Sequence, residues 1–494
     1  MVLKSYYDTD LFIRLEKFAA EQKNNLIFDF PIIRIQLAFF LGKFNGNKYD
    51  VSKISKDISY KKLPFNLGSF GELFKLRVQL IFLCLYNRNL LKNKVLLFGF
   101  SEHYYKQEGG IEFNLYLSPF KSELEKMGIE FEELLLSQSN FDGKLTRLKV
   151  FYDILYQYNT LSFSLKAKLY NKYRTYIENA DLLKGFLVKN NIPEVAHCIT
   201  TYYNAKLLHE IAYGTFKDLL RITQPKLIWV YAYNNNNVLA LCRAANSRQI
   251  PIVEYQHSQQ SDFHFAYSKW NLMDKYSQYF PSVFWAWSSE DANRISKNFS
   301  TQKYRPLVIS GGNMAIIQKK RLYNYKEPSA SNGVLVSLAG EWIPEFVEKF
   351  ISEDTKHTWY FRLHPRYPQD KVRLMEFQKR FPGKIETNIA NTLSIYQLFT
   401  FVIWNITNSS GTALEAEHFG IRNVIIGERG KEVYKEKIES GEFLAALNSN
   451  ELSFIMDGSG VEKAKKIEPI KNENEGMKKL ILAFDLRSTK IIAN

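Results

Sequence analysis

Cysteine is scarce in this chain. Only Cys84, Cys198 and Cys242 occur among 494 residues. They are odd in number and far apart, so they supply neither a disulfide framework nor the close spacing of a metal-binding motif. A reducing compartment is therefore favoured.

Long apolar segments are also missing. The longest, residues 78–86, has about half of the roughly 20 residues that a membrane-spanning helix needs. The first residues turn polar after three positions and show neither the apolar core nor the small-residue cleavage site of a signal peptide. These features predict a cytoplasmic protein that does not cross the bilayer.

Acidic residues are outnumbered by basic ones. The 66 Lys and Arg against 51 Asp and Glu give a net charge of +15. Such an excess suits a nucleic acid, an anionic membrane face or a negatively charged substrate, and it also occurs on ordinary soluble surfaces. The sequence shows no zinc-finger spacing and no RNA-recognition signature, so nucleic acid is the least supported partner.

Apolar and aromatic residues are plentiful. At 46% and 15% of the sequence they indicate a folded chain, and 494 residues suffice for about two to four domains. The first ninety residues and the stretch from 120 to about 220 show helical periodicity, with a strand expected at 95–100. After residue 225, strand-like and helical segments alternate, which is typical of parallel βαβ units.

A polar segment rich in charge, Pro, Ser and Asn at 318–333 is predicted to be a linker. It separates an expected N-terminal lobe at 1–317, with helical insertions, from a C-terminal lobe at 334–470. A terminal helix at 471–494 is free to cross back. The expected fold class is α/β, with two Rossmann-like lobes and a cleft between them. Because such sheets bind ligands at the carboxyl ends of their strands, we searched the residues that follow each strand.

The segment RLHPRY places His364 at the end of an expected strand, beside Arg362 and Arg366. Pro365 cannot donate to a ladder and ends the strand. His364 could donate to a phosphate or act as a general acid on a leaving nucleotide. The alternative is a histidine that only caps a strand end.

The segment NSSGTALEAEHFG follows another expected strand and begins a helix. Ser409 and Ser410 are expected at its N-cap, while Gly411 and Thr412 open the first turn, whose unpaired N–H groups favour a phosphate. Glu415, one turn later, could accept hydrogen bonds from ribose hydroxyls. The alternative is an ordinary capped helix with a solvated Glu415.

In the first half, VEYQHSQQSDFHFAY places Glu254 and Gln256 on the end of an otherwise apolar strand, followed by His257 and His264. Two polar side chains on one face of such a strand require a partner. They either line a cleft or form a buried hydrogen-bonded pair with surface histidines. Zinc between His257 and His264 lacks a third ligand at a recognisable spacing.

Two further groups complete the candidates. Gly312 and Asn313 close the strand RPLVISGG and either line the same cleft or form a simple turn. Glu102, with His103, lies in the polar loop after the strand VLLFGF, which is a common position for a site.

The EYQH strand end, the HP dipeptide and SSGTALEAEHFG together resemble GT-B nucleotide-sugar glycosyltransferases of bacterial capsule and lipopolysaccharide synthesis. The resemblance covers roughly residues 225–430, and the HP and SS elements are similar to those of bacterial sialyltransferases and capsule Kdo transferases. It implies a CMP-activated sugar whose phosphate contacts His364, Ser409 and Ser410. Ser258 replaces a glycine that usually follows the EXQH element.

The family's acidic catalytic base usually lies in a short acidic-acidic-Gly motif, which this sequence does not contain. Glu102 is the best substitute and Glu254 the second, so an inverting or retaining outcome stays open. The resemblance implies a metal-independent reaction with no cofactor, because basic side chains and helix N-termini stabilise the leaving nucleotide.

The function expected from the sequence is glycosyl transfer from a nucleotide sugar, with a CMP-sugar favoured, to a surface polysaccharide or lipopolysaccharide acceptor. The positive charge would hold the enzyme peripherally on the anionic inner membrane, where lipid-linked acceptors lie. The alternatives are a UDP-sugar-dependent transferase, a GT-B-fold UDP-sugar epimerase, a CDP-polyol phosphotransferase and a non-catalytic glycan-binding protein. Arg362, Arg366 and Arg429 would suit the diphosphate of UDP.

Overall fold

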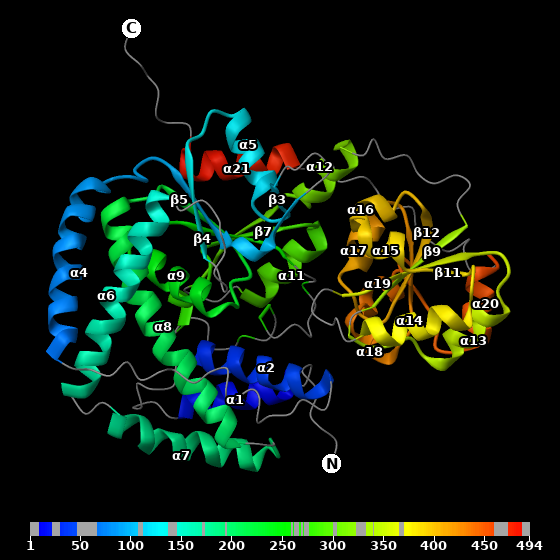
Figure 1. Cartoon of the computed structure of the whole chain (residues 1–494), viewed down its shortest axis with the longest axis horizontal. Coiled ribbons are helices and arrows are strands. Elements are labelled where there is room, and N and C mark those ends of the chain that lie inside the picture. Colours follow the sequence, from blue (N-terminus) through cyan, green and yellow to red (C-terminus); the bar gives the residue numbers. More distant parts are fainter. Residues whose placement is uncertain are drawn as a thin grey trace, which may run out of the picture. The chain divides into compact units, whose positions relative to one another are not determined.

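The chain forms two compact units, which are described separately (Figure 1). Unit 1 comprises residues 1–313 and 472–494, and unit 2 comprises residues 314–471. The computed structural model describes residues 9–21, 30–46, 67–106, 112–136, 146–169, 173–192, 195–257, 260, 266–267, 270, 276–299, 304–322, 332–338, 340–364, 370–458 and 473–486.

Unit 1 is built on a six-stranded parallel sheet in the order β4-β1-β5-β6-β7-β8. All six residues of β1 are buried, as the apolar run VLLFGF predicts. The strand order reverses between β1 and β5, which makes this pair the topological switch point of the sheet. The strands are β1 (Val95–Phe100), β4 (Phe131–Leu136), β5 (Leu227–Tyr231), β6 (Ile252–Tyr255), β7 (Val283–Ala286) and β8 (Leu307–Ser310).

Helices supply most of the rest of unit 1, as the periodicity of its first half predicts. In the described ranges no helix is long and apolar enough to span a membrane. The terminal helix α21 belongs to unit 1 and packs on β8, where Gly476 approaches Gly311 and Trp285. The helices are α1 (Thr9–Glu21), α2 (Phe30–Gly46), α4 (Leu67–Tyr86), α5 (Ser118–Lys126), α6 (Arg147–Leu169), α7 (Tyr173–Lys189), α8 (Val195–Thr223), α9 (Asn236–Asn246), α11 (Ser289–Phe299) and α21 (Glu473–Phe484).

Strand β4 corrects the expectation of continuous helix between residues 120 and 220. Its sequence, FEELLL, is not apolar throughout like the inner strands of the sheet. Strand β4 lies at the edge of the sheet, where its two glutamates are only partly buried. There Glu132 and Glu133 reach Lys94 and Lys121 at 3.3 and 3.4 Å. A short antiparallel pair, β2 (Tyr104–Lys106) and β3 (Glu112–Asn114), follows the one-turn helix η1 (Ser101–His103) after β1.

Buried aromatic rings fill the core of unit 1. Trp229 stacks on Phe120 with 3.6 Å between ring centroids, and the rings of Tyr255 and Trp285 lie 5.6 and 5.5 Å away. All three partners are at most 1% exposed. Part of the aromatic content of the sequence is therefore used in this core.

Unit 2 has a second six-stranded parallel sheet, in the order β11-β10-β9-β12-β13-β14. Here the switch point lies between β9 and β12. The sequence predicts five of these strands, and the short β14 is an addition. The strands are β9 (Gly333–Ser337), β10 (Thr358–Arg362), β11 (Ile385–Glu386), β12 (Val402–Thr407), β13 (Arg422–Ile425) and β14 (Leu444–Ala445).

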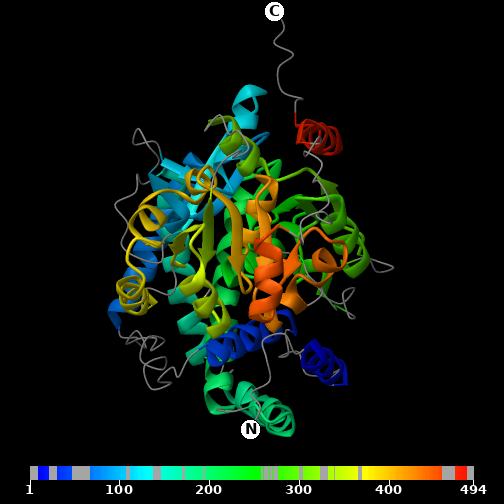
Figure 2. The same cartoon turned by 90° about the vertical axis from the view of Figure 1, so that its right-hand side faces the viewer.

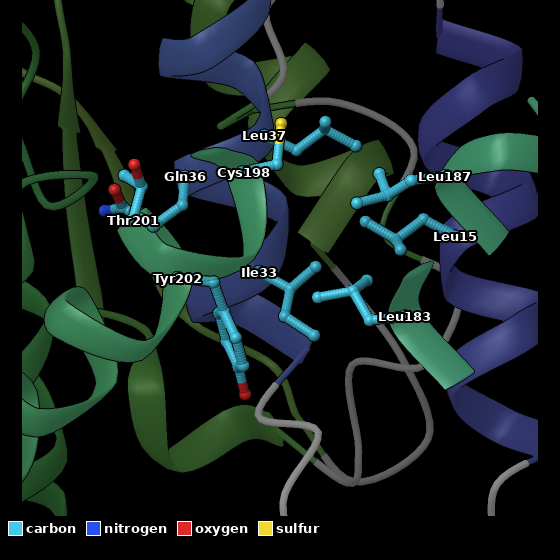
Figure 3. Close-up of a pocket in the computed structure, with 9 residues that line it drawn as sticks. All are labelled: Leu15, Ile33, Gln36, Leu37, Leu183, Leu187, Cys198, Thr201 and Tyr202. Atoms are coloured by element: carbon cyan, nitrogen blue, oxygen red, sulfur yellow. The ribbon is translucent and has the colours of Figure 1, made fainter. Parts of the chain in front are cut away.

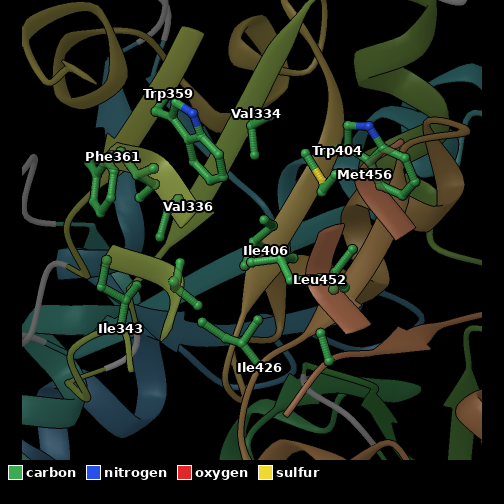
Figure 4. Close-up of a cluster of buried hydrophobic side chains, with 14 of the residues drawn as sticks. Val334, Val336, Ile343, Trp359, Phe361, Trp404, Ile406, Ile426, Leu452 and Met456 are labelled. Atoms are coloured by element: carbon green, nitrogen blue, oxygen red, sulfur yellow. The ribbon is translucent and has the colours of Figure 1, made fainter. Parts of the chain in front are cut away.

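One face of the unit 2 sheet packs on α13, α14 and α20. Val336, Trp359 and Ile406 project from the strands into this core, where Leu452 and Met456 of α20 meet them (Figure 4). Helices lie on both sides of the strands (Figures 1 and 2). They are α12 (Met314–Leu322), α13 (Glu345–Glu353), α14 (Asp370–Arg380), α15 (Asn388–Thr392), α16 (Ile395–Leu398), α17 (Thr412–His418), α18 (Glu428–Val433), α19 (Lys435–Glu439) and α20 (Ser449–Met456).

The two parallel sheets with their helices confirm the predicted α/β class with two Rossmann-like units and helical additions in the N-terminal half. The segment predicted as a linker differs at its start. Helix α12 ends at Leu322, so the first five residues of 318–333 are helical. Ile316, in the same helix, is buried. Residues 323–331 lie outside the described ranges.

Candidate functional site

The carboxyl edge of the unit 2 sheet gathers most of the residues predicted to bind a nucleotide. The loops after β9 and β12 flank the switch point, where sheets of this order bind ligands. The loops after β10 and β13 lie on the neighbouring strands. Topology therefore places segments that are up to ninety residues apart in sequence at one edge.

The loop after β12 corrects the predicted helix start. Helix α17 begins at Thr412 and its N-cap residue is Gly411, not Ser409 or Ser410. Ser410 is buried, and its hydroxyl accepts from the Thr412 amide (3.3 Å) and donates to the Thr412 hydroxyl (3.0 Å). The Ser410 hydroxyl thus fixes the loop, whereas Ser409 is half-buried and Gly411 is exposed.

A buried polar ladder ties this loop to three strands. The Ser337 hydroxyl donates to Asn405 Oδ1 (2.7 Å), and Asn405 Nδ2 donates to Asn423 Oδ1 (2.8 Å). Asn423 Nδ2 then donates to the Ala413 carbonyl (2.8 Å), and the Thr407 hydroxyl donates to the Ser337 carbonyl (2.7 Å). None of these residues is among the predicted site residues, although a polar Asn405 inside the apolar strand FVIWNITN is a usable signal.

Glu341, in the loop after β9, organises the same edge and was also missed. Its Oε1 lies 2.5 Å from Arg429 Nη1, and its Oε2 accepts from the amide of Asn408. Asn408 Oδ1 accepts from the Gly430 amide (3.1 Å). A Cβ at Gly430 would lie 1.6 Å from the Asn408 carbonyl oxygen, so only glycine allows this approach. These contacts hold together the loops after β9 and β12 and the first turn of α18.

Arg362 and His364 lie at the end of β10 and just after it. Arg362 Nη1 donates to the carbonyls of Ala390 (2.8 Å) and Leu393 (2.6 Å), so this nitrogen secures the chain around α15. Burial lowers the pKa of Arg362, while Glu415 and Tyr396 raise it. His364 is half-buried in the loop. Arg366, the second predicted arginine, lies outside the described residues.

Glu415 is a carboxyl group of this edge whose pKa is raised. Tyr396 of α16 donates from its hydroxyl to Glu415 Oε1 (3.2 Å). Burial raises the pKa of Glu415 to about 7, although the Tyr396 hydrogen bond and the charge of Arg362 act in the opposite direction. The raised pKa favours the protonated carboxyl, which can donate as well as accept a hydrogen bond.

In unit 1, Glu254 forms the centre of a buried cluster at the end of β6. It is 1% exposed, and its Oε1 accepts from the Tyr267 hydroxyl and from the Tyr233 amide (3.2 Å). His257 Nδ1 lies 3.2 Å from the Tyr267 hydroxyl and 3.6 Å from Glu254 Oε1. Among the residues that the structure describes, Oε2 of Glu254 has no hydrogen-bond partner. Burial and the charge of Glu254 raise the pKa of Tyr267.

The other residues predicted to line the unit 1 site have internal partners. Gln256 Oε1 accepts from the Trp287 amide (2.7 Å), and its Nε2 donates to Asp291 (2.9 Å). Asn313 Oδ1 accepts from the Tyr255 hydroxyl (3.2 Å). Gly312 has φ +79° and accepts at its carbonyl from the Trp285 indole, as a simple turn would. His264 lies outside the described residues.

The switch point of unit 1 carries aromatic and imidazole groups. His103 Nδ1 lies 2.9 Å from the Tyr231 hydroxyl, which accepts from the Phe100 amide (3.0 Å). Tyr116 stacks on Tyr231 with centroids 4.5 Å apart. Glu102, the first candidate base, is exposed on η1. His103 rather than Glu102 is thus the residue that the topology brings into this cluster.

A small apolar pocket lies elsewhere in unit 1, among α1, α2, α7 and α8, and includes none of the predicted residues (Figure 3). In the described ranges, no group of three or more His, Cys, Asp or Glu is arranged to hold a metal ion. The pocket is lined by Leu15, Ile33, Gln36, Leu37, Leu183, Leu187, Cys198, Thr201 and Tyr202.

Comparisons with known proteins give nucleotide-sugar enzymes among the similar solved structures. The UDP-GlcNAc 2-epimerase from Neisseria meningitidis bound to UDP-GlcNAc is 13% identical, with 80% of this chain and 99% of that chain covered and a TM-score of 0.47. A putative UDP-N-acetylglucosamine 2-epimerase from Listeria monocytogenes is 12% identical over 80% and 97%, with a TM-score of 0.48. The glycosyltransferase SnogD from Streptomyces nogalater is 13% identical over 79% and 99%, with a TM-score of 0.39.

The sequence matches no protein-family model and no curated protein. Identities of 12–13% and TM-scores below 0.5 are too low to transfer a substrate from the solved enzymes to this chain.

Proposed function

We propose that the chain is a nucleotide-sugar-dependent enzyme and that unit 2 binds the nucleotide at the β9/β12 switch point. The single observation that carries this proposal is that Glu341, Asn408 and Arg429 fix the loops after β9 and β12 to the first turn of α18 at that edge. A rigid edge with a positioned guanidinium can bind phosphate without reorganising first.

Gly411 supplies the open side of this edge. It is exposed, and a Cβ placed on it would contact nothing within 4 Å. A phosphate can therefore approach the backbone of the β12–α17 loop, with Ser409 beside it. Glu415, whose pKa is raised, is the group assigned to the ribose hydroxyls. His364 is assigned to the phosphate or to the leaving nucleotide.

We propose a uridine diphosphate sugar, in preference to a CMP-sugar, as the substrate. The CMP assignment relies on serine hydroxyls at a helix N-cap, but the Ser410 hydroxyl is bound to Thr412 and the N-cap is Gly411. A phosphate site that depends more on Arg429 and main-chain groups suits two phosphates at least as well as one.

Two reactions compete for the chemistry. Epimerisation of a UDP-sugar removes and returns a proton on one sugar carbon and needs acid and base groups but no acceptor. The buried cluster of Glu254, His257 and Tyr267 in unit 1 favours it, because these are acid and base groups held within hydrogen-bonding distance of each other. Glycosyl transfer to a glycan or lipid-linked acceptor, at an anionic membrane surface, is the second candidate, and the +15 charge favours it.

A thermal-shift screen with UDP, CMP, CDP and GDP tests the nucleotide proposal. A nucleotide at 100 times its Kd should stabilise the protein by about 2.7 kcal/mol. Arg429→Ala should remove the response to UDP, and the matched control Lys435→Ala, on the exposed α19, should keep it. Stabilisation by CMP and not by UDP would restore the CMP-sugar assignment, and no response to any nucleotide would refute the proposal.

Incubation with UDP-N-acetylglucosamine alone separates the two reactions. Appearance of an epimer without an acceptor identifies the epimerase. Sugar consumption only after a glycan or lipid acceptor is added identifies the transferase.

A further inference from the structure

Helix α4 of unit 1 exposes apolar side chains to an unusual degree. Phe74, Phe82 and Leu85 are 71%, 69% and 69% exposed, and Ile81 is 55% exposed. On the opposite side of the helix, Leu76 and Leu80 are buried, where α4 packs on α6. Phe70 and Tyr86 are also exposed, at 51% and 67%. The name α4 face is used below for the five residues Phe74, Val78, Ile81, Phe82 and Leu85.

These five residues form one continuous stripe. At about 100° per residue they fall within an arc of about 100°, the width of the apolar side of an amphipathic helix. In most helices of a folded domain this side faces the core. In α4 both sides are apolar, and the second one is exposed. The helix itself lies at the edge of unit 1 (Figure 1).

Basic side chains border the stripe on both sides. Lys75 lies about 20° beyond Phe82, and Arg77 lies about 40° beyond Ile81 on the other side. Both are exposed. The one acidic residue of α4, Glu72, lies about a further 60° beyond Lys75, away from the stripe.

The C-terminal end of α4 adds to the positive charge. The Arg147 guanidinium lies 3.7 Å above the Tyr86 ring and donates from Nε to Asn87 Oδ1 (2.8 Å). Arg88, two residues after the end of α4, is exposed. An aromatic ring beside a guanidinium is an arrangement suited to the polar boundary of a lipid layer.

We propose that the α4 face binds an anionic lipid surface, lying in the interface with its apolar stripe among the acyl chains and Lys75 and Arg77 at the phosphates. Charge complementarity selects this partner. Two copies of the face packed together would bring basic borders against each other, whereas an anionic bilayer satisfies both borders at once. The inference rests on the membrane contact of the second candidate reaction, glycosyl transfer, and it is independent of nucleotide binding.

Co-sedimentation of the full chain with vesicles tests the inference. Vesicles of phosphatidylcholine and phosphatidylglycerol should bind the protein, and the double variant Phe74→Glu/Phe82→Glu should weaken binding about tenfold or more. Phe454→Glu, at a 58% exposed phenylalanine of α20, is the matched control and should bind like the unchanged protein. Circular dichroism and the midpoint of thermal unfolding show whether the variants are folded.

The basic borders have their own test. Lys75→Gln and Arg77→Gln should each weaken binding to the anionic vesicles by about fivefold at low salt and change binding to pure phosphatidylcholine little. Equal binding by the double glutamate variant and the unchanged protein would overturn the inference. A concentration-dependent dimer that the same double variant abolishes would overturn it in favour of a second copy of the chain.

The outcomes separate this inference from the proposed function. Vesicle binding through α4 without any nucleotide response supports the inference and refutes the nucleotide proposal. A protein that responds to UDP but does not bind vesicles supports the nucleotide proposal and refutes the inference about α4.

Discussion

The carboxyl edges of the two sheets are built from different chemistry. In unit 2, amide and hydroxyl side chains fix the backbone, and Glu341 positions Arg429. In unit 1, a buried carboxylate is surrounded by tyrosine and histidine. The first arrangement suits recognition of an anion and the second suits proton transfer, although both edges belong to parallel sheets of closely related order.

The sharpest test of this difference removes the carboxylate of unit 1. Glu254→Gln should reduce epimerisation of UDP-N-acetylglucosamine by about 10² to 10⁴, because an acid or base group in the reaction contributes that much. Nucleotide binding, measured by calorimetric titration with UDP, should change little. Glu102→Gln, at the exposed candidate base, is the control, and an equal loss there would return the catalytic role to Glu102.

Substitutions at two glycines of unit 2 distinguish an effect on packing from an effect on nucleotide binding. Gly430→Ala should destabilise unit 2 by about 3 kcal/mol or more, because its Cβ would lie 1.6 Å from the Asn408 carbonyl oxygen. Gly411→Ala places its Cβ in open space, so thermal unfolding should stay within about 1 kcal/mol of the unchanged protein while UDP binding weakens. Undiminished UDP affinity in Gly411→Ala would show that no ligand approaches this loop.

The polar ladder of unit 2 should contribute about 2 kcal/mol to stability. Asn405→Ala leaves Ser337 and Asn423 with buried groups that lose their partner, and each such group costs about 1–3 kcal/mol. Urea unfolding measures the loss. Asn450→Ala, at an exposed position of α20, should be nearly neutral, and equal midpoints for the two variants would mean that the ladder contributes nothing.

The smallest expected effect is a pH dependence in unit 2. The pKa of Glu415 is raised from 4.5 to about 7, so the folded state holds a proton that the unfolded state releases in this range. The stabilisation from this group is therefore fully present below about pH 4.5 and is lost as pH rises through about 7. Urea unfolding at several pH values should show a flatter profile for Glu415→Gln, and identical profiles would contradict the raised pKa.

Local sequence predicted most of the strands. Runs such as VLLFGF and KLIWVYAY are apolar throughout because parallel strands are buried on both faces. Local sequence did not predict β4, because the glutamates of FEELLL interrupt the apolar run expected of a parallel strand. They pair with lysines at the edge of the sheet. Local sequence also misplaced the start of α17, because two serines and a glycine in a row offer several N-cap positions and the Ser410 contact with Thr412 selects one.

The candidate sites could be predicted only in part. Strand ends drew attention to His364, Glu254 and the SSG loop. Glu341 and Tyr396 lie in a loop and a short helix without a motif, and they contact the candidate sites through hydrogen bonds to residues distant in sequence. No periodicity or spacing marks such partners.

The sequence by itself determined the α/β class, the presence of two parallel sheets and the strand ends at which to look, because burial and alternation are local properties of the chain. Tertiary structure alone decided which polar groups meet at each edge and that α4 turns an apolar stripe outward beside Lys75 and Arg77. Periodicity shows that a helix has an apolar side, but which side is covered depends on what packs against it, and only the folded chain supplies that.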